Sequence, residues 1–257
     1  MERWWLAIAT VLAAVAGGCG LRAVWHGRRT MVVAIALGVA LVFQFAFLLE
    51  RGVLRGACPL RDQGEVLVFL AWSLVLFYLI IGPAYRWSPT GVFTVPLVLV
   101  FQVMALIPGT LSENPERVAG GDPWSEGHAA MSVLSYGSLA LAAVSGMMFL
   151  VLDRVLKEHH LQSRWFRVLP PVRELLVAMV RLLRLGVLLL SVGIGCGVMA
   201  ARASGIVAHG HLVAALVVWV GYLVLLVVQE VRGISGRRLA LSAVLLFAVS
   251  LSVFAFL

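Results

Sequence analysis

The stretch MVVAIALGVALVFQFAFLL, Met31 to Leu49, runs for 19 residues without a formal charge. Residues 90–107, TGVFTVPLVLVFQVMALI, and residues 239–257 are uncharged over a similar length. A helix rises about 1.5 Å per residue, so roughly 20 apolar residues cross the hydrocarbon core of a bilayer. The chain is therefore predicted to be an integral membrane protein.

Composition supports this prediction. Of the 257 residues, 62% are hydrophobic and 12% are charged, against about 45–50% and 25% in soluble domains. The net charge of +8 would suggest nucleic acid in a soluble protein, but loop arginine in a membrane protein usually reflects orientation. We expect membrane lipid around the chain and no nucleic-acid partner.

Apolar runs bounded by charge, Pro or Gly predict an all-α, polytopic bundle of about eight transmembrane helices. Short connections favour a single domain over residues 1–257. The predicted spans are 4–25, 31–49, 65–86, 90–109, 128–152, 176–201, 211–229 and 238–257.

Basic residues in alternate loops set the orientation, because they are retained on the cytoplasmic side. With both termini on the outer (periplasmic) face, 14 of the 20 Lys and Arg residues are cytoplasmic. The 14 are Arg22, Arg28, Arg29, Arg86, Arg154, Lys157, Arg164, Arg167, Arg173, Arg181, Arg184, Arg232, Arg237 and Arg238.

The stretch PPVRELLVAMVRLLRLG, residues 170–186, carries Arg173, Arg181 and Arg184 on one broad flank at helical spacing. Arginine at the bilayer centre costs about 2.5–3.5 kcal/mol on insertion scales. We expect this stretch at the cytoplasmic interface, with its arginines reaching anionic lipid headgroups. A functional anion site is the alternative.

Small residues recur every four positions in two of the spans: Gly193 and Gly197, and Ser138, Ala142 and Gly146. Such spacing lets helix backbones approach closely. It predicts tight packing within the bundle.

Motifs of soluble enzymes are missing from the sequence, including the P-loop, HExxH, GxSxG and CxxC. We also expect no carboxylate inside the spans, where the polar residues are Gln44, Gln102 and Gln229. Proton-coupled transport usually needs an ionisable group at mid-membrane. This disfavours a small-solute transporter.

Three histidines fall at span starts on the predicted outer face: His128 opens the fifth span, and His209 and His211 open the seventh. Imidazole is a common ligand of haem iron, so His128 with one of the other two, His211 foremost, could supply two axial ligands. The alternative is that histidine simply suits a wet interface. His209 and His211 diverge on a helix, so at most one points with His128.

Trp72 and Trp219 lie seven and eight residues inside their predicted spans, at matching depth. Their flat rings could line a porphyrin pocket. Packing within the bundle is the alternative interpretation.

The stretch HAAMSVLSYGSLALAAVSGMMFLVLDRVLKEHH, residues 128–160, resembles the CcsA/HemX-type cytochrome c assembly family. Supporting matches are EVLVFLAWSL at 65–74, LPPVRELLVAMVRLLRLGVLLLSVGIGCGVM at 169–199, and GISGRR at 233–238. Smaller members of that family are eight-helix proteins of the bacterial inner (cytoplasmic) membrane.

The resemblance implies haem as a cofactor and apocytochrome c and other maturation proteins as partners. His128 looks like the family's outer-face haem ligand. We expect binding or transfer of haem at the outer leaflet, without enzymatic activity of the chain by itself, since thioether formation would need a partner.

Two departures from the family pattern favour an alternative. The tryptophan-rich WWD loop of larger members is replaced by ARASGIVAHGHL at 201–212, and Gln44 and Gln229 stand where relatives often carry histidine. The chain could therefore be a structural or regulatory subunit that has lost haem binding.

Overall fold

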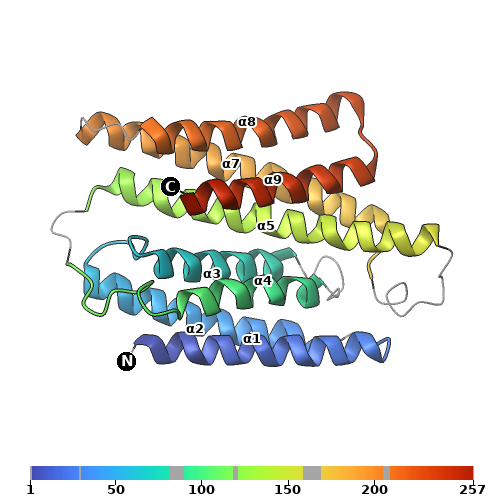
Figure 1. Ribbon diagram of the computed structural model, residues 1–257, viewed down its shortest axis with the longest axis horizontal. Coiled ribbons are helices and arrows are strands. Elements are labelled where there is room, and N and C mark those ends of the chain that lie inside the picture. The colour runs from blue at the N-terminus through green and yellow to red at the C-terminus, as the bar shows by residue number, and fades with distance from the viewer. Residues whose placement is uncertain are drawn as a thin grey trace. The chain divides into compact units, whose positions relative to one another are not determined.

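The computed structural model describes residues 2–28, 30–81, 90–117, 121–158, 169–204 and 209–256, without the side chains of 2, 209–212 and 253–256. These residues form eight α-helices and, within that description, no strand (Figure 1). The helices are α1 (Glu2–Trp25), α2 (Val32–Arg55), α3 (Gln63–Ile81), α4 (Thr90–Ala105), α5 (Pro123–Lys157), α7 (Val172–Ser204), α8 (His209–Arg232) and α9 (Gly236–Phe256).

We expect this fold to be surrounded by membrane lipid. Six of the helices are long and apolar enough to cross a membrane, and α4 is a shorter apolar helix. On α2, Ile35, Val42 and Leu49 are each more than half exposed, and their spacing of seven places them on one face of the helix. The fold is an all-α, polytopic membrane bundle, as predicted.

Each of the eight predicted spans corresponds to one helix, but several boundaries differ by four to six residues, among them the end of α2 and both ends of α5. Helix α2 continues six residues past Leu49 to Arg55, because the charged side chains there are buried in ion pairs. Helix α5 begins at Pro123, so His128 lies in its second turn and does not open it. Residues 82–86 of the third predicted span lie outside the described residues.

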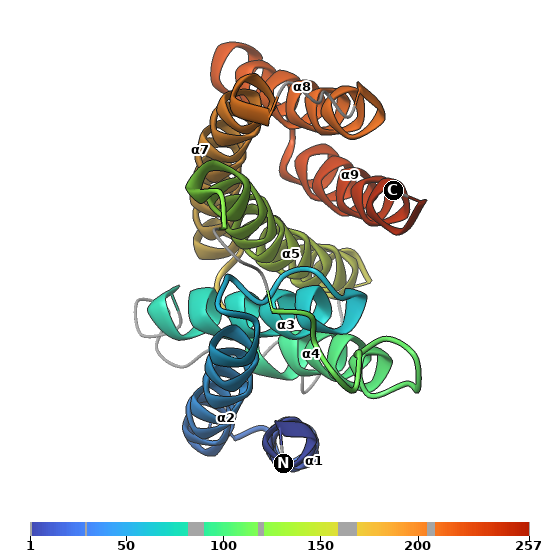
Figure 2. The same ribbon diagram turned by 90° about the vertical axis from the view of Figure 1, so that its left-hand side faces the viewer.

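The chain divides into two compact units, each described here by itself. Unit 1 comprises Met1–Gly121 and Arg154–Pro171, and unit 2 comprises Asp122–Asp153 and Val172–Leu257. In unit 1, α1 contacts α2 and α4, and α3 contacts the same two helices, so the four form a closed ring (Figure 2). A single domain over 1–257 stays a prediction.

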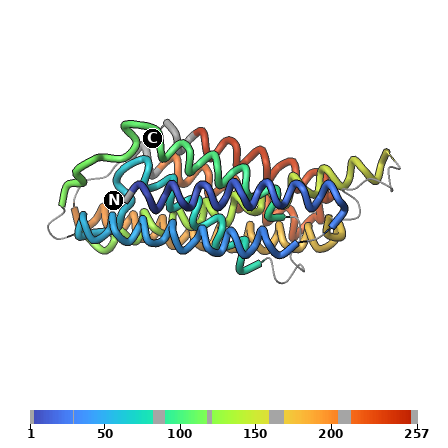
Figure 3. The backbone as a smooth tube through the Cα atoms, turned by 90° about the horizontal axis from the view of Figure 1, so that it is seen from below, coloured from blue at the N-terminus to red at the C-terminus, as the bar shows by residue number. Residues whose placement is uncertain are grey.

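Unit 2 is a second group of four helices. Helix α8 contacts α7 and α9. Helix α5 packs on α7, where the Ser138 hydroxyl donates to the Leu182 carbonyl at 2.9 Å, and on α9, where a Cβ added at Gly146 would lie 3.2 Å from the Ala240 carbonyl oxygen. Within each unit the helices run roughly parallel or antiparallel (Figure 3).

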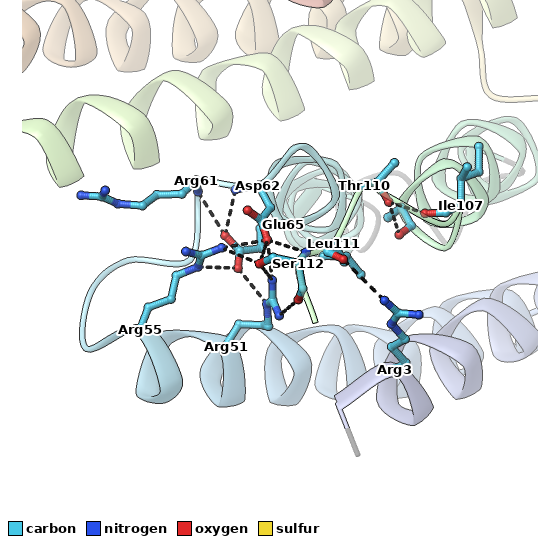
Figure 4. A network of polar contacts seen from close by, with 11 residues as sticks. Arg3, Arg51, Arg55, Arg61, Asp62, Glu65, Ile107, Thr110, Leu111 and Ser112 are labelled. Atoms are coloured by element: carbon cyan, nitrogen blue, oxygen red, sulfur yellow. Dashed lines mark hydrogen bonds and ion pairs between the residues drawn. The ribbon is translucent and has the colours of Figure 1, made fainter. Parts of the chain in front are cut away.

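A buried ion network joins the end of α2, the start of α3 and the segment after α4 (Figure 4). Its members are Arg51, Arg55, Asp62, Glu65 and Ser112. The Nε atoms of Arg51 and Arg55 donate to the same Glu65 oxygen at 2.8 and 2.7 Å. Their Nη2 atoms lie 2.6 and 2.8 Å from Asp62 Oδ2. Two guanidinium groups thus face two carboxylates, and the formal charges cancel.

Ser112 ties the segment after α4 into this network. Its backbone N–H and its hydroxyl donate to Asp62 at 3.0 and 2.6 Å, and its carbonyl accepts from Arg51 at 2.9 Å. Glu65 is completely buried in the first turn of α3. Glu65 lies at one end of its helix and its charge is paired, so the expectation that the spans lack an ionisable group at mid-membrane stays a prediction.

The network also holds Asp62 ionised. Burial alone would raise the pKa of this carboxyl, but hydrogen bonds from Ser112 and the charge of Arg55 outweigh burial, and the pKa falls below the ordinary value of 3.8. Asp62 therefore stabilises the folded state above the pKa it has when unfolded, and that contribution is lost as the pH falls through the lower folded pKa.

We predict that Arg51→Met lowers the free energy of unfolding by about 3–5 kcal/mol, because it leaves Glu65 buried with half of its ion pairing. Arg154→Met is the matched control: its partner is Glu158 and its side chain is 80% exposed, so it should change stability by about 1 kcal/mol or less. Unfolding in a denaturing detergent measures both. Equal, small effects would show that the network contributes little.

A second prediction concerns acid. Asp62→Asn should be less stable than wild type at neutral pH, and the two should converge as the pH falls below the ordinary carboxyl pKa of 3.8, because wild type alone loses the Asp62 contribution there. Thermal unfolding across this pH range measures the difference. Glu116→Gln, at an exposed position, should follow the wild-type curve, and a constant offset for Asp62→Asn would contradict the prediction.

Candidate functional site

Helix α5 is fixed at its start by a side-chain cap. Asp122 precedes Pro123, the first helical residue, and its Oδ2 atom accepts from the backbone N–H and the hydroxyl of Ser125 at 3.0 and 2.8 Å. The Ser125 hydrogen bonds hold the pKa of Asp122 below its usual value. A charged carboxylate suits the positive end of the helix dipole. This cap sets the position of His128, one turn further on.

His128 is half-buried and contacts α7. Its Nδ1 atom lies 2.7 Å from the backbone carbonyl oxygen of Gly193. A carbonyl can only accept, so Nδ1 carries the proton and donates. In the neutral ring the lone pair is then on Nε2. A backbone carbonyl behind one ring nitrogen is the usual support for an imidazole that ligates a metal through the other.

Two glycines of α7 make room for this contact. A Cβ at Gly197 would lie 2.7 Å from His128 Nδ1, and a Cβ at Gly193 would lie 2.9 Å from the Ser132 hydroxyl oxygen. A larger side chain at either position would have to displace the His128 ring or the Ser132 hydroxyl. The close packing predicted from the Gly193 and Gly197 spacing is confirmed.

Trp219 of α8 reaches the same part of α7. Its indole N–H donates to the Ser191 hydroxyl at 2.8 Å, and that hydroxyl donates to the Val187 carbonyl at 2.7 Å. Ser191 is two residues from Gly193, about 3 Å along the helix axis. Trp219 and His128 thus contact α7 at similar heights, but from opposite sides, because residues two apart point in nearly opposite directions on a helix.

His209 and His211 form the first turn of α8, and their side chains lie outside the described residues. Their backbone can be placed along the bundle. His211 is eight residues before Trp219, which places it about 12 Å further toward the C-terminal end of α7, because α7 and α8 are antiparallel. That level is within about one or two helical turns of the His128 contacts. Whether either imidazole faces His128 stays a prediction.

Trp72 belongs to unit 1 and has the contacts of a core residue. Its ring centroid lies 5.5 Å from that of Phe69 and 6.2 Å from that of Phe45. It also packs against the buried cluster that contains Phe47 and Val68. The pocket predicted between Trp72 and Trp219 stays a prediction.

Polar groups without a partner are also buried in unit 1. The side-chain amides of Gln44 and Gln102 and the Trp72 indole N–H have no hydrogen-bond partner among the described residues. Along the sequence, each is three or four residues, about one helical turn, from a member of one buried hydrophobic cluster. Those members are Phe47, Val68 and Ala105. These amides and the indole can hydrogen bond to a polar group, but none is an imidazole.

Sequence reasoning did not find the partners of the site residues. The Gly193 carbonyl carries no side-chain signal, whereas Ser191, a lone hydroxyl in an apolar run, could have indicated a partner for Trp219. Within the described part of the chain, no three His, Cys, Asp or Glu residues are grouped to hold a metal ion. Haem needs only one or two axial ligands, so the donor at His128 Nε2 fits one of them.

Comparison with known proteins supports the resemblance. Residues 62–256 match the family model described as cytochrome C assembly protein. The cytochrome c biogenesis protein CcsA of Trieres chinensis is 28% identical over 135 residues, 51% of this chain and 43% of that protein. CcsA of Chlorella vulgaris is 31% identical over 110 residues, 42% and 35% of the two chains. The matched segments therefore cover less than half of these relatives.

We predict that Gly197→Ala destabilises unit 2 by about 1–3 kcal/mol, because the new methyl group must displace the His128 ring and break its bond to Gly193. Gly195→Ala is the control: its Cβ would meet no atom within 4 Å, and alanine should stabilise the helix by up to about 1 kcal/mol. Unfolding in a denaturing detergent measures both. Equal effects at the two positions would contradict the contact.

Proposed function

Because the chain belongs to the cytochrome c assembly protein family, we propose that it handles haem during cytochrome c maturation and that His128 ligates the haem iron. The observation that carries the proposal is the hydrogen bond from Nδ1 to the Gly193 carbonyl. It fixes the ring orientation and leaves Nε2 as the donor atom.

Other residues of unit 2 contribute position and exclusion of water. Trp219, whose indole is held by Ser191, is proposed to offer a flat apolar face to the porphyrin, which requires haem to extend around α7 from the side that His128 contacts. His211, or His209 in its place, is the second proposed ligand, since the first turn of α8 lies within reach of that level. Trp72 belongs to unit 1, so its proposed part in haem binding rests on the sequence alone. Bound haem would supply the group that is passed to apocytochrome c.

The setting of this function follows from the helices and the family. The chain is a multi-pass membrane protein, and we place it in the bacterial inner (cytoplasmic) membrane with His128 on the outer face. Apocytochrome c and other cytochrome c maturation proteins are its proposed partners. The chain by itself would bind and pass on haem, and the partner would complete thioether formation.

The second candidate function is a structural or regulatory subunit of the same family without haem. The buried Gln44 and Gln102 amides favour it, because they occupy the interior of unit 1 without offering an imidazole to iron. This candidate predicts that all three outer histidines are dispensable for cytochrome c maturation.

We predict that the purified protein, supplemented with haem, shows a Soret band and that His128→Ala lowers haem affinity by about 10-fold or more, as expected for loss of a ligand. His26→Ala is a matched control. His26 also directs Nδ1 at a backbone carbonyl, that of Arg22 at 2.7 Å, but it is exposed and lies in unit 1. It should leave the band unchanged.

Two outcomes separate the candidate functions. Folded protein without a Soret band, combined with normal maturation in a strain carrying alanine at all three outer histidines, would favour the subunit without haem. A maturation defect from His128→Ala alone, at a normal protein level, would exclude that candidate. His209→Ala and His211→Ala, compared separately, identify the second ligand by the change in the absorbance spectrum.

A further inference from the structure

Helices α7, α8 and α9 line an open pocket of about 400 Å³ within unit 2, beside the turn that joins α8 to α9. Its volume is in the range of small-ligand sites. The walls are mostly apolar and come from all three helices and the turn. Leu176, Val180, Ile234 and Leu239 are among the apolar side chains, and Arg181, Arg184 and Gln229 are the polar ones.

The two arginines of this pocket have different surroundings. Arg184 is paired with Glu230 of α8. Arg181 has no acidic partner among the residues that the structure describes. The charge of Arg181 is therefore not neutralised by a carboxylate, and the pocket carries a net positive charge. Its lining includes no carboxylate that would repel an anion.

The surroundings of the pocket strengthen this charge. Arg232, Arg237 and Arg238 lie at the end of α8 and the start of α9, and all three are exposed. The opposite end of α7 carries a single arginine, Arg202. An anion near the α8–α9 turn thus meets a concentration of positive charge that the other end of these helices does not offer.

Gln229 gives the pocket a second polar requirement. Its side-chain oxygen Oε1 is buried and has no hydrogen-bond partner among the described residues. A buried amide oxygen without a donor is unfavourable by about 1–3 kcal/mol. A ligand that fits this pocket would therefore present a hydrogen-bond donor, such as a hydroxyl, as well as an anionic group for Arg181.

The position of the pocket along α7 points to the membrane surface. Helix α7 has 33 residues, about 50 Å at 1.5 Å per residue, whereas the hydrocarbon layer is about 30 Å thick. Arg181 and Arg184 are level with the last turn of α8, because Arg184 pairs with Glu230. The pocket thus lies where α8 ends, with α7 continuing beyond it, and a bilayer that ends with α8 would bring lipid headgroups to this level.

We propose that this pocket binds the headgroup of an anionic phospholipid. The phosphate contacts Arg181, a headgroup hydroxyl donates to Gln229 Oε1, and the acyl chains follow the apolar surface toward the bilayer. Basic pockets between transmembrane helices are known sites for acidic lipid headgroups. The site is independent of haem and is present whether or not His128 binds iron.

Binding of single lipids to the purified full-length chain tests the proposal, measured by native mass spectrometry from a non-ionic detergent. Phosphatidylglycerol carries both the phosphate and headgroup hydroxyls, and phosphatidylcholine is the neutral comparison. We expect phosphatidylglycerol to bind about 10-fold or more tightly than phosphatidylcholine, and Arg181→Gln to remove most of that preference. Gln229→Leu should weaken phosphatidylglycerol binding while keeping the charge.

The matched control is Arg173→Gln. Arg173 is an exposed arginine of the same helix that does not line the pocket, so this change should preserve the preference. Equal losses for Arg173→Gln and Arg181→Gln would overturn the pocket in favour of diffuse surface charge. Equal binding of the two lipids would overturn the anion site. Displacement of the lipid by inorganic phosphate at equal concentration would identify a free anion as the occupant and overturn the lipid assignment.

Discussion

Hydrocarbon offers no hydrogen-bond partner, so polar groups inside this protein are stabilised where the chain itself supplies one. Arg51, Glu65 and Asp62 meet that constraint with ion pairs that close one end of unit 1. His128 meets it with a backbone carbonyl of α7, and Trp219 with a hydroxyl of the same helix. Each pairing fixes the orientation of a side chain. A site residue requires such a fixed orientation, and an apolar contact does not supply it.

The helices were predictable from sequence because the bilayer demands long apolar runs, and all eight appear close to their expected ranges. The end of α2 was not predictable in this way. A boundary drawn where the apolar run stops leaves Arg51 and Arg55 outside the helix. Their partners Asp62 and Glu65 lie 7 to 14 positions further along the chain. The available signal for an ion network was a set of opposite charges lying close together in the sequence on either side of a turn.

The candidate site could be predicted only in part. His128 was identified by its residue type and its place near the start of a span. Its partner was not, because the Gly193 carbonyl belongs to the backbone, and whether a carbonyl is free to accept depends on how two helices pack. The glycine spacing of α7 did predict that packing, since only glycine lets the His128 ring come so close to the backbone.

The hydrogen bond at Nδ1 also limits what His128 can do. An imidazole that shuttles protons must exchange donor and acceptor roles between its two nitrogens. The Gly193 carbonyl accepts from Nδ1 at 2.7 Å and has no proton to return, so the ring cannot switch tautomer while that contact lasts. His128 is thereby suited to hold a group through Nε2 and unsuited to conduct protons across the bilayer.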